Sequence, residues 1–97
     1  MKEIHLDGAK FTDRRGFFRE MARLLAPGNE DEVGRNLDAL NDLLRGGFGF
    51  HDYGEPITVI WEHYPTSIAN LGERDMLRIL EVMLDADSGH DCTVKLK

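Results

Sequence analysis

The hydrophobic residues at the start of the chain recur with two periods, and these predict a strand and then a helix. Lys2 to Leu6 alternates between apolar and polar residues, as a strand with one buried face does. A helix follows, capped by Thr12 or Asp13 and ended by Pro27-Gly28. Its apolar residues form one stripe at helical spacing: Phe17, Met21, Leu24 and Leu25.

A second helix is predicted from Asn36, which can cap it, to about Arg45, before Gly46-Gly47. Its apolar side consists of leucines, and we expect these to be buried: Leu37, Leu40, Leu43 and Leu44. The opposite side is polar, because helical spacing places four residues on one face: Asp38, Asn41, Asp42 and Arg45. Before this helix, Asn29 to Gly34 is predicted to be a loop with three consecutive acids, Glu30-Asp31-Glu32.

The middle of the chain is predicted to contain an irregular loop and a fully buried strand. Phe48 to Glu55 is rich in glycine and aromatic residues and has no periodicity, which indicates a loop. Its aromatic residues either fold back on the core or contact a partner. Ile57 to Trp61 follows Pro56 and is apolar on both faces, as a strand buried on both sides would be. Pro65 to Leu71 is expected to hold a helical turn or short helix.

The last part of the chain is predicted to form the longest helix and a final strand. The helix spans Glu73 to Asp87, and its expected buried stripe is Met76, Ile79, Leu80 and Met83, widened by Leu77 and Leu84. In the strand, Cys92, Val94 and Leu96 alternate with Thr93, Lys95 and Lys97. The order of elements predicts an α/β fold with helices on a small parallel sheet.

The composition narrows the class of protein. Ninety-seven residues predict a single domain over residues 1–97. No apolar run approaches the roughly 20 residues of a membrane span, and the N-terminus has no signal region, so we expect a cytoplasmic protein that binds no membrane. The net charge of −6 argues against nucleic-acid binding, which needs clustered Lys and Arg, and favours a basic partner or simple solubility.

The charge is concentrated around the second predicted helix. Residues 30–42 carry five acids and one arginine, a net charge of −4 out of −6. The acids are Glu30, Asp31, Glu32, Asp38 and Asp42. Three interpretations are open: a solvated helix face, a docking surface for cations, or a catalytic carboxylate pair. The last would need burial to separate two pKa values, and no apolar pocket is suggested beside Asp38 and Asp42.

The remaining reactive residue types form no recognisable site. The four histidines, His5, His51, His63 and His90, have no metal-ligand spacing and are expected to be surface or loop residues. Cys92 is the only cysteine, so it can form no internal disulfide, and we expect it to be a small core residue. The sequence therefore predicts no metal, no cofactor and no catalysis. We expect a monomer, since Lys95 and Lys97 protect the last strand from pairing with another chain.

The segment from Gly34 to Asp42 resembles the barstar family motif Gly-x-Asn-Leu-Asp-Ala-Leu-x-Asp, and all seven specified positions match. The order of elements is also similar from end to end. The resemblance implies a three-stranded parallel sheet flanked by three to four helices. It further implies inhibition of a secreted, barnase-like, guanyl-preferring ribonuclease in a 1:1 complex, with the acidic helix and the preceding loop blocking the active site.

Carried onto this chain, the resemblance implies that Asp38 and Asp42 contact the nuclease's cations, with Asp42 standing in for the RNA phosphate. Gly34 would let the loop backbone approach closely. The neighbouring partner-binding residues would be Glu32, Val33, Arg35, Asn41 and Arg45. Several of these depart from barstar: Glu32-Val33 replaces a tyrosine pair, Asn41 a tryptophan and Arg35 a glutamate.

Two further features differ from barstar. The loop from Gly46 to Glu55 is longer, and we expect Phe48 to Gly54 to add contacts or rigidity. The late-helix acid of the family's interface has Asp85 as its nearest counterpart, with Leu84 at the ungapped position. The alternatives to ribonuclease inhibition are an acidic adaptor or antidote for another basic protein or toxin, and a small carboxylate-dependent hydrolase.

Overall fold

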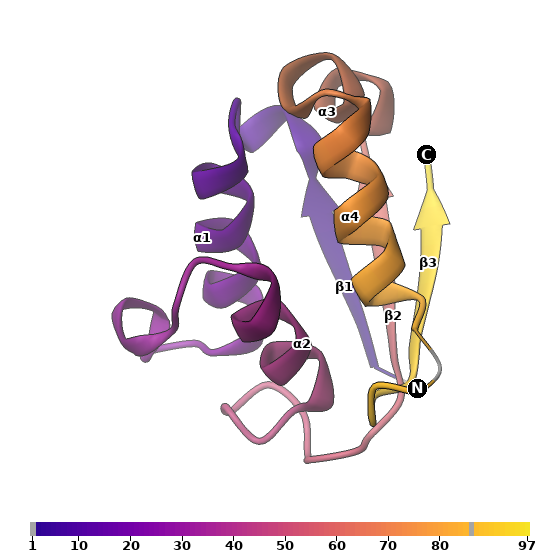
Figure 1. Ribbon diagram of the computed structural model, residues 1–97. Coiled ribbons are helices and arrows are strands. Elements are labelled where there is room, and N and C mark those ends of the chain that lie inside the picture. Colours follow the sequence, from indigo (N-terminus) through magenta and orange to yellow (C-terminus); the bar gives the residue numbers. More distant parts are fainter. Residues whose placement is uncertain (1, 86) are drawn as a thin grey trace.

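The computed structural model describes residues 2–85 and 87–97, and these form an α/β fold built on a parallel sheet (Figure 1). The strands of the sheet are β1 (Lys2–Asp7), β2 (Ile57–Glu62) and β3 (Cys92–Leu96), in the order β1-β2-β3. The α-helices are α1 (Arg14–Leu25), α2 (Leu37–Arg45), α3 (Tyr64–Leu71) and α4 (Glu73–Met83). Short 3₁₀ helices are η1 (Gly8–Lys10) and η2 (Glu30–Glu32). The predicted fold class is confirmed.

The central strand β2 is parallel to both of its neighbours and is buried on both faces, as its sequence predicted. Val59 aligns with Ile4 of β1 and Val94 of β3 on the face that meets the helices. On the other face, Ile60 aligns with His5 and Lys95, both exposed, and is itself 8% exposed. The outer strands therefore alternate between apolar and polar residues, while β2 is buried from Ile57 to Trp61, with Thr58 as the one polar residue in that stretch.

The core lies between the sheet and the helices, and Trp61 at the end of β2 is completely buried in it. The Phe17 ring of α1 stacks on the Trp61 ring with centroids 5.3 Å apart, and the Tyr64 ring meets it edge-on. In Figure 1, α1, α2 and α4 lie in front of the sheet and α3 lies beyond the carboxyl ends of β1 and β2. Helix α2 contacts both α1 and α4, so it is held mainly by other helices.

The predicted last helix is too long, and part of its predicted buried surface is exposed. α4 ends at Met83, so α1, with 12 residues, is longer than α4, with 11; Ala86, inside the predicted span, lies outside the described residues. Leu77 and Leu84 are 60% and 58% exposed, and Leu96 of β3 is also exposed. Leu77 follows buried Met76, and Leu84 follows buried Met83, the last residue of α4, so each is turned about 100° away from the buried stripe.

The hydrogen bond between Trp61 and Ser67 generates a test of the fold. Trp61 Nε1 donates to Ser67 Oγ at 3.0 Å, and Ser67 is fully buried. Ser67→Ala leaves the indole N–H without its acceptor, so we expect the free energy of unfolding to fall by about 1–3 kcal/mol. Urea denaturation measures this, with exposed Thr66→Ala in the same helix as control. Equal stability of the two variants would show that the bond contributes nothing.

Candidate functional site

Helix α2 orients the predicted acidic residues toward solvent. Leu40, Leu43 and Leu44 are at most 2% exposed, while Leu37 is half-buried rather than fully buried. Asp38 and Asp42 are exposed on the other side, as their spacing predicted. The predicted cap is also confirmed, because Asn36 Oδ1 accepts a hydrogen bond from the Ala39 N–H at 2.8 Å.

The acids before α2 form a 3₁₀ helix, η2, where a loop was predicted. Asp31 and Glu32 are exposed and Glu30 is half-buried. Together with Asp38 and Asp42 these residues make up a surface that we call the acidic surface: Glu30, Asp31, Glu32, Asp38 and Asp42. No compensating ion pair within residues 2–85 and 87–97 involves Asp31, Glu32 or Asp38.

Asp42 is the member of the acidic surface that the rest of the protein positions. Arg45 Nη1 donates to Asp42 Oδ1 at 3.1 Å, while Arg45 Nε donates to the carbonyl oxygen of Ser88 at 2.8 Å. Ser88 lies in the turn after α4, so Arg45 joins α2 to a distant part of the chain. The Asp42 side chain remains 60% exposed, so a partner can reach it.

The loop after α2 folds back onto the helix end. Gly46 has φ +95°, and a Cβ there would clash with the carbonyl oxygen of Asp52, so the turn requires glycine. The Gly54 N–H donates to the Arg45 carbonyl at 2.6 Å. Phe48 and Phe50 pack partly buried against the core, whereas Tyr53 is 74% exposed. Two of the three aromatic residues therefore fold back, and Tyr53 is available to a partner.

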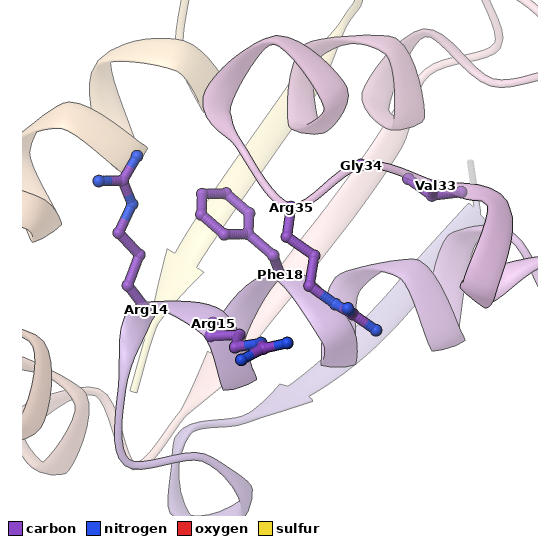
Figure 2. A pocket seen from close by; sticks show the side chains of 6 residues that line it. All are labelled: Arg14, Arg15, Phe18, Val33, Gly34 and Arg35. Carbon is purple, nitrogen blue, oxygen red and sulfur yellow. The ribbon is translucent and has the colours of Figure 1, made fainter.

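Two hollows lie on either side of the segment before α2. One, of about 630 Å³, is lined by Arg14, Arg15, Phe18, Val33, Gly34 and Arg35 (Figure 2); we call it the arginine hollow. The other, of about 510 Å³, is lined by Asn29, Glu32, Val33, Gly47, Phe48 and Gly49. The structure thus brings Glu32, Val33, Gly34 and Arg35 together at the surface beside α2, and their role in binding stays a prediction.

The arginine hollow and the Arg45–Ser88 contact were not identified from the sequence. Arg45 and Ser88 are 43 positions apart, and no local pattern connects them. The hollow did have a sequence signal, since Arg14 and Arg15 begin α1, which has no acid in its first turn. Cations are unfavourable at that end of a helix, so their presence there points to a role other than helix stability.

The histidines and the cysteine do not form a reactive site. His51 and His90 are loop residues but are buried, and the Nε2 atom of each bonds a backbone carbonyl, of Leu44 and Val82. Burial raises the pKa of the half-buried Cys92 thiol to about 12, so the thiol is not ionised at neutral pH. Among the described residues, no group of histidines, cysteines and acids could hold a metal, and no helix could cross a membrane.

The predicted late-helix acid lies after the helix. Asp85 follows the end of α4, is exposed, and accepts a hydrogen bond from the Asp87 N–H at 3.0 Å. Its carbonyl oxygen accepts from the Ser88 hydroxyl at 2.7 Å, so Asp85 belongs to the same turn that holds Arg45. This connects Asp85 to the Asp42 end of the acidic surface, and its participation in binding remains a prediction.

The whole chain, residues 1–97, matches the family model described as Barstar (barnase inhibitor). No curated protein matches the sequence at a significant level.

Replacing Arg45 tests whether it fastens α2 to the turn after α4. Arg45→Met keeps most of the aliphatic stem and removes both hydrogen bonds, so we expect the free energy of unfolding to fall by about 1–2 kcal/mol. The bond to Ser88 accounts for most of this, because an exposed ion pair such as that with Asp42 contributes little. Urea denaturation measures the loss, with exposed Arg78→Met on α4 as control. An Arg45→Met variant as stable as the control would refute this role.

Proposed function

The chain belongs to the barstar family, and from this premise we propose that it inhibits a secreted barnase-like ribonuclease by blocking the active site in a 1:1 complex. The family consists of inhibitor proteins and not of enzymes. The observation that carries the proposal is the acidic surface, where Asp38 and Asp42 are exposed on a helix that is fixed by buried leucines. A nuclease must present cations to the phosphates of RNA, and a fixed pair of carboxylates is complementary to such a cleft.

In the proposed mechanism, Asp42 takes the place of an RNA phosphate. A carboxylate can accept several charge-assisted hydrogen bonds at once, and a phosphate-binding cleft supplies several donors. Arg45 holds one Asp42 oxygen and leaves the carboxylate 60% exposed. This contact favours one orientation of the Asp42 side chain before binding, which reduces the side-chain entropy lost when the complex forms.

The proposed close approach of the partner at Gly34 is supported by the lack of any internal reason for glycine there. Gly34 does not have a positive φ, and a Cβ would lie 3.4 Å from Ala39 Cβ and from Asn36 Nδ2. The chain itself could therefore accommodate a small side chain with little adjustment. Because glycine has no side chain, a partner can approach the backbone at position 34 closely. Val33 and Glu32 beside it would contribute flanking contacts.

Asn41 and Arg35 would complete the interface around the two aspartates. Asn41 is half-buried beside Asp42 in sequence, and its Oδ1 atom has no hydrogen-bond partner among the described residues. Because this oxygen is itself buried, the exposed part of the Asn41 side chain would make the contact with the nuclease. Arg35 is exposed directly before the cap of α2, where it limits the approach of cations and thereby fixes the register of the complex.

The proposed function is tested by titrating the protein into a secreted guanyl-preferring ribonuclease encoded beside its gene and following RNA cleavage. Cleavage should stop at one equivalent of inhibitor. If no such nuclease is inhibited while another basic protein co-purifies from the native cell at low salt, the chain is an antidote for that protein instead.

Truncation of Asp42 should reduce inhibition most. Asp42→Ala leaves the nuclease's cations unpaired in a desolvated cleft, so we expect a loss of at least ~2 kcal/mol, or about 30-fold in the inhibition constant. An aspartate is a known hot spot of the barstar interface, so this ranking is partly inherited from the family. Asp38→Ala should cost less, because its charge also interacts favourably with the N-terminus of α2.

The matched control for Asp42→Ala is Glu3→Ala. Glu3 is exposed on the face of β1 opposite the buried Ile4, so its removal changes the net charge equally without touching α2. Inhibition constants for the parent and the three variants decide the matter. If Asp42→Ala inhibits as well as Glu3→Ala, the proposed mechanism is wrong even if the protein is an inhibitor.

Association should be fast and sensitive to salt. The −4 charge of residues 30–42 should steer a basic nuclease and raise the association rate constant above the ~10⁵–10⁶ M⁻¹s⁻¹ of unsteered pairs. Stopped-flow measurements across ionic strength should show a steep decline, because added salt screens exposed charges. Ala substitutions at Glu30 and Asp31 should mainly slow association. A rate constant that is the same at low and high salt would contradict electrostatic steering.

A further inference from the structure

We propose that the arginine hollow receives an acidic side chain of the partner protein, so that charges of both signs hold the complex together. This inference rests on the proposed function and deepens it. The acidic surface requires cations on the partner. The arginine hollow requires, in addition, an anionic side chain on the partner at a defined place beside those cations.

The hollow is formed by two segments that are distant in sequence. Arg14, Arg15 and Phe18 come from the start of α1, and Val33, Gly34 and Arg35 come from the segment between η2 and α2. Figure 2 shows Arg14 on one side of the Phe18 ring and Arg35 on the other. The Phe18 ring is 3% exposed, and the Arg14 guanidinium carbon lies 5.4 Å from its centroid. The three arginines of the hollow therefore lie around a largely buried aromatic ring.

The three arginines of the hollow lie around one hollow and have no anionic partner among the described residues. Arg23 pairs with Glu20, and Arg45 pairs with Asp42. Within residues 2–85 and 87–97, no ion pair involves Arg14, Arg15 or Arg35. Three like charges around one hollow repel one another, and two of them also oppose the dipole of α1. An anion placed between them would relieve both effects.

A carboxylate on a protein fits this place better than RNA does. The guanidinium group presents parallel N–H donors that match a carboxylate bidentately. A polyanion such as RNA would also have to lie along the acidic surface, because Arg35 is separated from Glu32 and from Asp38 by only two residues on either side. A single acid on an otherwise basic protein avoids that repulsion. Gly34 and Val33 line the hollow and belong to the proposed interface, so one partner can cover both regions.

The proposal is tested by whether removing two arginine charges from the hollow raises or lowers the affinity for the nuclease. Arg15→Gln with Arg35→Gln lowers the net charge from −6 to −8. If these arginines were merely solvated, the variant would bind a basic nuclease faster and at least as tightly. If they hold a carboxylate, the dissociation rate should rise and the affinity should fall about tenfold or more. The control is Arg74→Gln with Arg78→Gln, which makes the same charge change at exposed positions of α4.

The measurements are association and dissociation rates of the parent and both double variants with a secreted guanyl-preferring ribonuclease of the native cell. Weaker binding of the hollow variant alone supports the proposal, and a double-mutant cycle with amide substitutions of the nuclease's surface acids should then identify the acid coupled to Arg35. Binding by the hollow variant that equals or exceeds that of the parent overturns the proposal while leaving inhibition intact.

Two further outcomes separate this inference from its premise. A parent protein that does not bind the nuclease would overturn the proposed function and this inference together. A fluorescein-labelled single-stranded RNA that binds the parent but not the hollow variant would assign the hollow to nucleic acid and overturn the proposal. Equal urea midpoints for the three proteins establish that the differences arise at the surface and not from unfolding.

Discussion

The burial of three leucines in α2 determines where Asp38 and Asp42, the two aspartates of the acidic surface on that helix, lie. The helix has nine residues, too few to be stable alone in water, so it exists because Leu40, Leu43 and Leu44 pack between α1 and α4. Each such burial contributes about 1.5–3 kcal/mol. Because successive residues turn by about 100°, burying these leucines leaves Asp38 and Asp42 facing solvent. The same contacts that stabilise the helix therefore orient the carboxylates of Asp38 and Asp42 toward solvent.

The elements whose patterns are local could be predicted from the sequence. β2 was recognisable because apolar residues occupy both of its faces, interrupted only by Thr58, and α2 because leucines and acids separate at helical spacing. The prediction was wrong where hydrophobicity alone had to decide burial. Leu77 and Leu84 are apolar but exposed, because α4 has only one narrow stripe in contact with the rest of the fold. The sequence shows which residues are apolar but not how much surface is available to cover them.

Contacts between distant segments could not be predicted from this one sequence. The buried states of His51 and His90 depend on carbonyl groups at the ends of helices that precede them by several residues. The bond from Arg45 to Ser88, and the approach of Arg35 to Arg15, form only when α2 packs in its place. These long-range contacts shape the candidate site, so the sequence identified its two aspartates but not how Arg45 positions one of them or what lies beside them.

The division between buried and exposed residues also explains how partner choice can change while the fold stays the same. The positions that depart from the barstar pattern are Glu32, Val33, Asn41 and Arg35, and none of them belongs to the fully buried core. In water, charges about 4 Å apart interact with only ~1 kcal/mol, so the free protein tolerates unpaired arginines beside unpaired acids. Once a partner excludes that water, each charge must be matched or it costs free energy. Under the proposal made above, arginine in place of glutamate at position 35 matters little for folding, because Arg35 is exposed, and matters for binding when a nuclease presents, or lacks, the acid to meet it.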